Sequence, residues 1–235
     1  MKKIILSVFA ASLLFSCSMD STPYIPTYTI GENFNTSIEG WKGDFADYPV
    51  GAEDFYELKF AQAKLPMPLD TTKKALRISG NNHSDDLFMY ITRKYSGLKA
   101  NQKYSINFEV EFASNAPSNA MGVGGAPGES VYFGLGLTSI EPRKVIDSTS
   151  NHYKMNIKKM QQATSGDDMK VYGNIANGTE KNEYKLIRKS GVFTGKTDAK
   201  GDIWLIIGTD SGFEATTTLY YTGLRATVQE VQGGI

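Results

Sequence analysis

Four polar stretches of the chain carry the side chains that could bind a ligand. They are residues 43–56, 80–86, 122–130 and 209–214, and they mix carboxylates, amides and hydroxyls with aromatic rings. Carboxylates and amides exchange hydrogen bonds with sugar hydroxyls, and aromatic faces pack on the C–H side of a sugar ring. Oxygen-rich clusters of this kind can also hold a calcium ion. The chemistry predicted is therefore glycan binding, with calcium as a possible cofactor.

The candidate ligand-binding residues share carboxylate, amide, hydroxyl, imidazole or phenol groups. They are Asp44, Asp47, Tyr48, Glu53, Asp54, Tyr56, Asn81, Asn82, His83, Asp85, Asp86, Glu129, Ser130, Asp210 and Glu214. Each stretch also has a purely structural interpretation, as a solvated loop or as a turn that satisfies its own backbone through Asx turns. A single site requires the four stretches to meet at one end of the fold.

No catalytic residue is predicted. His83 and His152 are the only histidines, and no motif pairs either of them with a nucleophile. Glycoside hydrolysis needs two opposed carboxylates, whereas Glu109 and Glu111 fall on the same face of one predicted strand. A carboxylate-dependent glycan hydrolase or lyase stays an alternative to a non-catalytic binding module. A structural component of the cell envelope is a third possibility, and an exposed apolar patch would favour it.

The elements that must position these residues are strands. Residues 97–112 open with a turn and then alternate apolar and polar side chains from Tyr104 to Phe112, which predicts a strand with one buried face. Residues 87–95 and 202–208 are apolar on both faces and belong in the interior. About ten to twelve short strands predict an all-β, antiparallel, jelly-roll-like β-sandwich. Residues 155–162 could form one or two helical turns.

The N-terminus predicts export. Residues 1–16 read as a signal peptide, with Lys2 and Lys3 before an uncharged run of twelve residues, where a membrane span needs about 20. Residues 14–17 resemble a bacterial lipobox, which implies cleavage before Cys17 and acylation of its thiol and amine. Ser18 follows in place of an inner-membrane retention Asp and favours the outer membrane, on its periplasmic or its exposed side. The alternative is an ordinary secretory signal.

The sequence after the signal peptide predicts one tethered domain. Residues 17–28 are the acylated cysteine and linker, and residues 29–235 are a single β-sandwich. The chain has 25 basic and 25 acidic residues. Removing residues 1–16 takes away two lysines and no acid, which leaves a small negative charge. Without a basic stripe, nucleic acid is excluded as a partner. The expected partners are the membrane, through the lipid, and a glycan.

Two resemblances add to this. Gly97-Leu98 leading into Tyr104, together with Phe34 and Gly40-Trp41, resembles carbohydrate-binding modules and galactose-binding-like domains of jelly-roll fold. That resemblance implies a structural calcium between an acidic residue near the first strand and an Asp in the last, although residues 220–224 contain no Asp. The chain is also similar, over residues 43–58, 79–89, 122–132, 173–178 and 208–221, to uncharacterised bacterial lipoproteins of no known activity, which implies that these loops are their distinctive part.

Overall fold

A computed structural model describes residues 25–232 of the chain, so the expectations for the signal peptide and Cys17 lie outside the described residues. The regular elements in this range are all strands. They are β1 (Thr27–Asn33), β2 (Lys42–Ala46), β3 (Tyr48–Pro49), β4 (Lys59–Lys64), β5 (Lys74–Asn81), β6 (Leu87–Tyr95), β7 (Lys103–Ser114), β8 (Val131–Thr138), β9 (Lys144–Asp147), β10 (His152–Met155), β11 (Met169–Asn174), β12 (Lys185–Lys196), β13 (Ile203–Ser211) and β14 (Thr216–Glu230). Residues 25–232 contain no helix with the length and apolar character to traverse a bilayer.

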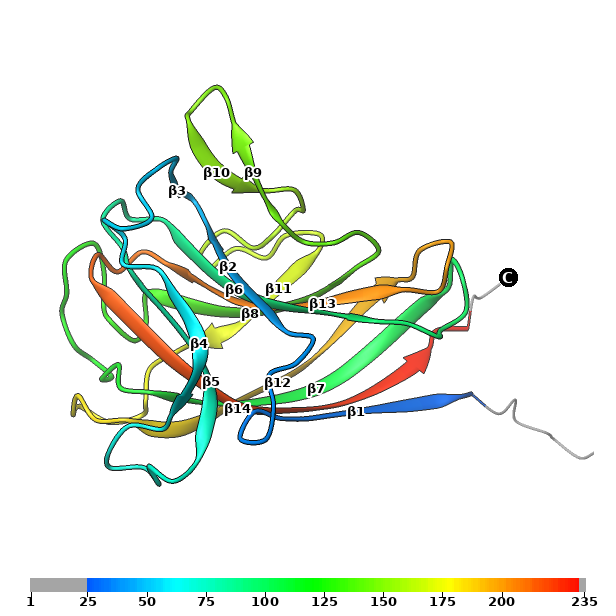
Figure 1. The fold of residues 1–235 in the computed structure, drawn as a ribbon, viewed down its shortest axis with the longest axis horizontal. Helices are drawn as coiled ribbons and strands as arrows, with labels where there is room; N and C mark the ends of the chain where they lie inside the picture. Colours follow the sequence, from blue (N-terminus) through cyan, green and yellow to red (C-terminus); the bar gives the residue numbers. More distant parts are fainter. Residues whose placement is uncertain (1–24, 233–235) are drawn as a thin grey trace, which may run out of the picture.

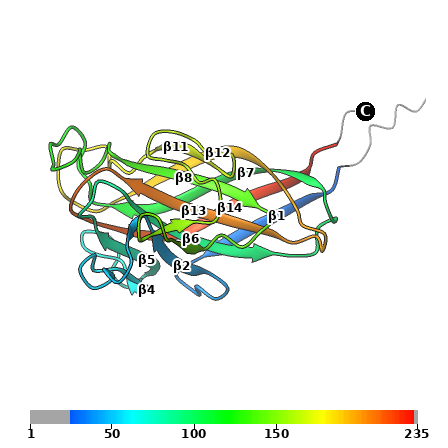
Figure 2. The same ribbon diagram turned by 90° about the horizontal axis from the view of Figure 1, so that it is seen from above.

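The strands form a jelly-roll β-sandwich, as predicted. One sheet has the order β12-β7-β14-β5-β4, with β1 also paired to β14, and the facing sheet has the order β11-β8-β13-β6-β2 (Figures 1 and 2). Eight of the strands divide equally between these sheets, in the orders β5-β14-β7-β12 and β6-β13-β8-β11, which is the strand order of a jelly roll. The fourteen strands exceed the ten to twelve expected, because β2, β3 and β9 are short strands within sequence that reads as loop.

The interior strands were correctly identified from their apolar patterns. In β7 the side chains from Tyr104 to Phe112 alternate between fully buried and outward-facing positions. Strands β6 and β13 are interior strands of the five-stranded sheet, and alternate side chains of each pack into separate apolar clusters, so both strands are buried on two faces. Burying these apolar side chains between the sheets is the main favourable contribution to the fold.

Three sequence-based expectations were wrong in detail. Residues 43–56 are not all loop, because β2 and β3 lie there. Residues 209–211 continue β13 rather than forming a turn. Residues 155–162 are not helical; instead Ile157 and Met160 pack on Phe88 and cover the outer face of the five-stranded sheet. The backbone of this segment bonds to residues that follow it, because Gln161 exchanges hydrogen bonds with Thr164 and Lys158 O accepts the N–H of Asp168.

Strand β14 is shared by two partners that lie end to end along one of its edges. Its first part, from Thr216 to Tyr221, pairs with β5, and its second part, from Gly223 onward, pairs with β1. A bulge at Thr222 separates the two parts, so that Thr222 and Gly223 both face outward between the buried Tyr221 and Leu224. The junction leaves a break in the sheet beside β14.

Candidate functional site

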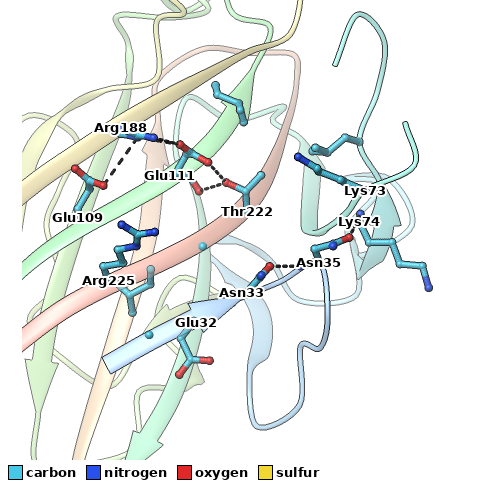
Figure 3. A pocket seen from close by; sticks show the side chains of 15 residues that line it. Glu32, Asn33, Asn35, Lys73, Lys74, Glu109, Glu111, Arg188, Thr222 and Arg225 are labelled. Carbon is cyan, nitrogen blue, oxygen red and sulfur yellow. Dashed lines mark hydrogen bonds and ion pairs between the residues drawn. The ribbon is translucent and has the colours of Figure 1, made fainter. Parts of the chain in front are cut away.

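A polar hollow of about 510 Å³ opens on the outer face of the six-stranded sheet, at the junction of β1, β5 and β14 (Figure 3). Most of its side chains are charged or polar. Its lining comprises Gly31, Glu32, Asn33, Asn35, Leu65, Lys73, Lys74, Glu109, Glu111, Leu186, Arg188, Thr222, Gly223, Leu224 and Arg225. The outward face of β7, which holds Glu109 and Glu111, therefore lies at a hollow and not on an open surface.

The floor of the hollow carries two arginines and two glutamates on three neighbouring strands. Arg188 of β12 lies opposite Glu111 of β7, and Glu109 of β7 lies opposite Arg225 of β14. The Nε and Nη2 atoms of Arg188 both lie 2.8 Å from Glu111 Oε2, and Arg188 Nε lies 3.9 Å from Glu109 Oε1. Thr222 donates its hydroxyl to Glu111 Oε1 at 2.9 Å. Cross-strand register places the two arginines opposite the two glutamates.

The wall beside β14 depends on the bulge and on the turn after β1. Phe34 donates its N–H to Thr222 O at 3.1 Å, and Asn35 Oδ1 accepts the N–H of Lys74 at 2.8 Å. These bonds fix the turn across the break between β1 and β5. The outward bulge then lets the Thr222 hydroxyl reach Glu111.

A second hollow of about 490 Å³ adjoins the first and shares Gly31, Glu109 and Arg225 with it. The two hollows follow the outward faces of β7 and β14. We call them together the sheet-face groove. Arg225 lines both hollows and so lies where they meet.

The groove presents hydrogen-bond donors and acceptors side by side. Arg188 and Arg225 offer guanidinium N–H groups, and Glu109 and Glu111 offer carboxylate oxygens. The two carboxylates are neighbours on one strand and both face Arg188. They are not the opposed pair that glycoside hydrolysis uses.

The four polar stretches chosen from the sequence do meet at one end of the sandwich, which we call the loop end. Asn81 donates its N–H to Tyr56 O at 2.7 Å, and Asn82 Nδ2 donates to Ser211 O at 2.9 Å. Gly212 donates its N–H to Ser130 O at 2.9 Å. Residues 43–56, 80–86, 122–130 and 209–214 are thus joined by direct hydrogen bonds, as a single site requires.

Many polar groups at the loop end already serve the fold. Asn82 is 2 % exposed and bonds two carbonyl groups of the β13–β14 connection. Ser130 Oγ accepts the N–H of Ala126, and Glu129 Oε1 accepts the N–H of Asn119. The half-buried Glu214 donates its N–H to Val123 O. These residues hold the loops in shape, which is the structural interpretation that the sequence offers as the alternative to ligand binding.

A tyrosine cluster accounts for another group of candidates. Tyr48 is buried and its ring packs on those of Tyr56 and Tyr153. Lys144 donates to Tyr48 Oη at 2.8 Å and pairs with Asp44 Oδ1 at 3.0 Å. Three further candidates belong to the same segments: Glu53 is half-buried, whereas Asp54 and Asp85 are exposed. Exposed His83 stacks on exposed Phe55 with ring centroids 4.0 Å apart.

The remaining candidates form a buried ionic cluster of Asp47, Asp86 and Asp210 with Lys154 and Lys159. Lys159 Nζ lies 2.6 Å from Asp210 Oδ2 and 2.9 Å from Asp47 Oδ2. Lys154 Nζ lies 2.9 Å from Asp47 Oδ1 and 3.7 Å from Asp86 Oδ2. One oxygen from each carboxylate lies within 4.8 Å of the others, a spacing that could hold a metal ion. The Lys159 ammonium already supplies a cation between two of them.

Burial and like charges shift the ionisation of this cluster. Burial, followed by the carboxylates of Asp47 and Asp210, raises the pKa of Asp86 to about 6. Burial acts to lower the pKa of Lys159, but Asp210 and Asp47 outweigh it, so that this pKa lies above its ordinary value. Lys159 therefore stays charged at neutral pH.

The structural calcium implied by the jelly-roll resemblance does not fit the residues present. The acidic residue near the first strand is Glu32, whose carboxylate accepts from Arg93 at 2.7 Å, Tyr95 Oη at 2.9 Å and Trp41 Nε1 at 3.3 Å. A guanidinium thus neutralises the carboxylate that calcium would need.

Sequence reasoning missed the groove residues Arg188, Thr222 and Arg225 and left Glu109 and Glu111 undecided. The polar face of β7 is visible as alternation, but its partners depend on cross-strand register. The sequence offers one signal for these partners, which is a charged side chain at an outward position in two long C-terminal strands. These side chains are Arg188 in β12 and Arg225 in β14.

Comparisons with known proteins give only distant likenesses. No protein-family model matches the sequence, and no curated protein matches it. Among solved structures, the chain is similar to a xylan-binding domain from Paenibacillus barcinonensis, with 9% identity, 87% of this chain and 95% of that chain covered, and a TM-score of 0.37. It is also similar to a cleaved adhesin domain of Lys-gingipain from Porphyromonas gingivalis, with 10% identity, coverage of 88% and 99%, and a TM-score of 0.34.

A third likeness is to the enzymatically active domain of a bacteriophage tailspike protein, with 9% identity and a TM-score of 0.35. It covers 85% of this chain but only 20% of that chain. All three TM-scores are below 0.5, so the assignment of the jelly roll rests on the strand order of this chain.

Proposed function

We propose that this protein is a non-catalytic glycan-binding module, anchored to the outer membrane through a lipid at Cys17. The observation that carries the binding function is the row of Arg188, Glu111, Glu109 and Arg225 along the floor of the sheet-face groove. Each sugar hydroxyl is both a donor and an acceptor, and vicinal hydroxyls match a floor on which carboxylates and guanidinium groups lie side by side.

The groove also has a suitable size and position. Its two adjoining hollows of about 510 and 490 Å³ lie within the usual range for ligand pockets. They follow the sheet face rather than ending in a closed cavity, so an oligosaccharide could lie along them. Because the floor belongs to three paired strands, binding needs little reorganisation.

The binding experiment is isothermal titration of the detergent-solubilised full-length protein with oligosaccharides chosen from a glycan array. We expect at least one glycan to bind and Glu111→Ala to weaken it, because the floor loses the carboxylate that holds Arg188. The matched control is Glu141→Ala, which breaks an exposed pair with Lys42 outside the groove. Absence of binding to every glycan, or equal binding by Glu111→Ala, would refute the proposal.

The anchoring rests on the sequence of residues 1–17 and has its own test. Cells fed a labelled fatty acid should label the wild-type protein and should not label Cys17→Ser. The wild-type protein should fractionate with outer membranes, whereas Cys17→Ser, which loses the acylation and cleavage site, should be absent from them. Fatty-acid label in the variant, or its recovery with outer membranes, would refute the lipid anchor and leave the binding function to be judged separately.

A further inference from the structure

We infer that the glycan taken by the sheet-face groove is anionic, with its carboxylate or sulfate groups placed against Arg225. This inference rests on the proposed glycan-binding function and specifies the chemistry of the ligand. Four features of the groove support it: the balance of its charges, the unequal pairing of its two arginines, the position of Arg225, and the kind of surface that it offers to a sugar ring.

Cations outnumber the available carboxylates at the larger hollow. Lys73, Lys74, Arg188 and Arg225 line it, and Glu32, Glu109 and Glu111 are its acidic residues. Glu32 is unavailable to a ligand, because Arg93, Tyr95 and Trp41 take up its carboxylate and it points away from the floor (Figure 3).

The two arginines of the floor are not equivalent. Arg188 is paired with Glu111 and lies 3.9 Å from Glu109, so its charge is largely balanced within the protein. Arg225 is exposed, and in Figure 3 no hydrogen bond or ion pair joins it to the other residues drawn, although Glu109 lies opposite it in register. Its guanidinium keeps its donors for a ligand, and planar carboxylates match that fork.

Arg225 also lies at the centre of the groove. It lines both hollows, so an acidic group bound there would lie midway along the groove. Lys73 reaches toward the larger hollow, whereas Lys74 points away from it (Figure 3). Lys73 has only a loose pair with Asp70, at 3.8 Å, and thus offers a second positive charge to a chain of acidic sugars.

The groove offers no exposed aromatic platform among the described residues that line it. The larger hollow has no aromatic lining residue, and the smaller one has only Phe108, which is 2 % exposed. A neutral sugar would lose the stacking that aromatic rings usually supply. Affinity in this groove must come from charge and hydrogen bonds, which an acidic sugar exploits more fully.

The test compares polygalacturonate with the same polymer after chemical reduction of its carboxyl groups. Binding to full-length protein in detergent is measured by affinity electrophoresis and by titration calorimetry, alongside dextran sulfate, unmodified dextran and the neutral glycan panel. We expect the acidic polymers to bind at least about tenfold more tightly than their neutral counterparts. We expect Arg225→Ala to lower the affinity for the acidic polymers about tenfold. Lys94→Ala, which removes a cation of β6 on the other sheet, should keep wild-type affinity.

The outcomes separate the two proposals. Equal binding of the acidic and the neutral polymer in both pairs, or an Arg225→Ala variant that binds like wild type, would overturn the anionic ligand while glycan binding stands. Failure of every acidic and neutral glycan to bind would overturn the proposed function itself. A preference for dextran sulfate over dextran without one for polygalacturonate would support the anionic ligand and identify it as sulfated. A thermal melt of Arg225→Ala confirms that the variant is folded.

Discussion

Arg188 and Glu111 face each other across the β12–β7 boundary, with two guanidinium nitrogens 2.8 Å from the same carboxylate oxygen. The other oxygen of Glu111 accepts from Thr222 on β14. One carboxylate therefore links three strands of the sheet on its outer face. Since exposed ion pairs stabilise proteins little, this arrangement is better explained by the groove that it shapes.

Glu111→Gln should weaken glycan binding while leaving the fold intact. The amide keeps the shape and the bond to Thr222 but loses the charge that holds Arg188. We expect about a tenfold loss of affinity and a change of at most about 1 kcal/mol in the free energy of unfolding. Calorimetry and urea denaturation measure the two quantities. A large loss of stability with unchanged affinity would show that the pair is structural.

Asp86→Asn should stabilise the protein at neutral pH. The folded-state pKa of Asp86 is about 6, above its ordinary value of 3.8, so ionising it costs folding free energy as the pH rises between these values. The full shift would correspond to about 3 kcal/mol, and solvent screening at this partly exposed side chain reduces our expectation to about 1–2 kcal/mol.

Urea denaturation from pH 4 to pH 8 checks this expectation. The stability gain from Asp86→Asn should be close to zero at pH 4 and complete above pH 6. Asp85→Asn is the matched control, because Asp85 is the exposed neighbour and Asn tolerates its left-handed backbone, with φ of 57°. A gain that does not depend on pH would contradict the burial and like-charge origin of the shift.

Lys159→Met should destabilise the fold strongly. The lysine side chain is 8% exposed, and its loss leaves Asp47 and Asp210 buried without the cation that lies between them. Removing one partner of a buried ion pair costs about 3–5 kcal/mol. The neighbouring Lys158→Met breaks only the exposed pair with Asp167 and should change stability by less than about 0.5 kcal/mol. Equal losses in the two variants would show that the buried cluster is not specially stabilising.

Gly223→Ala should separate β1 from β14. An added Cβ would lie 2.8 Å from the carbonyl oxygen of Glu32, a backbone atom that cannot move without the strand. We expect a loss of about 1–3 kcal/mol and faster hydrogen exchange of the β1 amides. Gly31→Ala is the control, because its Cβ would meet no atom within 4 Å. Equal hydrogen-exchange protection of the β1 amides in the two variants would show that the close approach at Gly223 does not hold β1 against β14.

The fold could be predicted from the sequence because its signals are local. The alternation from Tyr104 to Phe112 and the two-sided apolar character of β6 and β13 fix which strands are inside. The short strands β2 and β9 were missed because each is stabilised by pairing with another strand: β2 pairs with β6, and β9 pairs with β10.

The candidate site was only partly predictable for a related reason. Asp47, Asp86 and Asp210 were chosen for their chemistry, but their partner Lys159 comes from a segment with no motif. The groove depends on register, which places Arg188 opposite Glu111 and Arg225 opposite Glu109. It also depends on a one-residue bulge at Thr222 that no composition rule signals.

The pairing of β1 with β14 has a mechanical consequence. Strand β1 begins at Thr27, beside Gln229, at the pole of the sandwich opposite the β13–β14 turn (Figure 1). With the chain tethered at Cys17 and a polymer held in the groove, tension would run along the axis of β1. This tension would load all the pairs from Thr27↔Gln229 to Asn33↔Gly223 in shear at the same time, so the pairs would not separate one after another. In the proposed tethered module, β1 would therefore pass this force to β14 through seven residue pairs that are loaded in parallel.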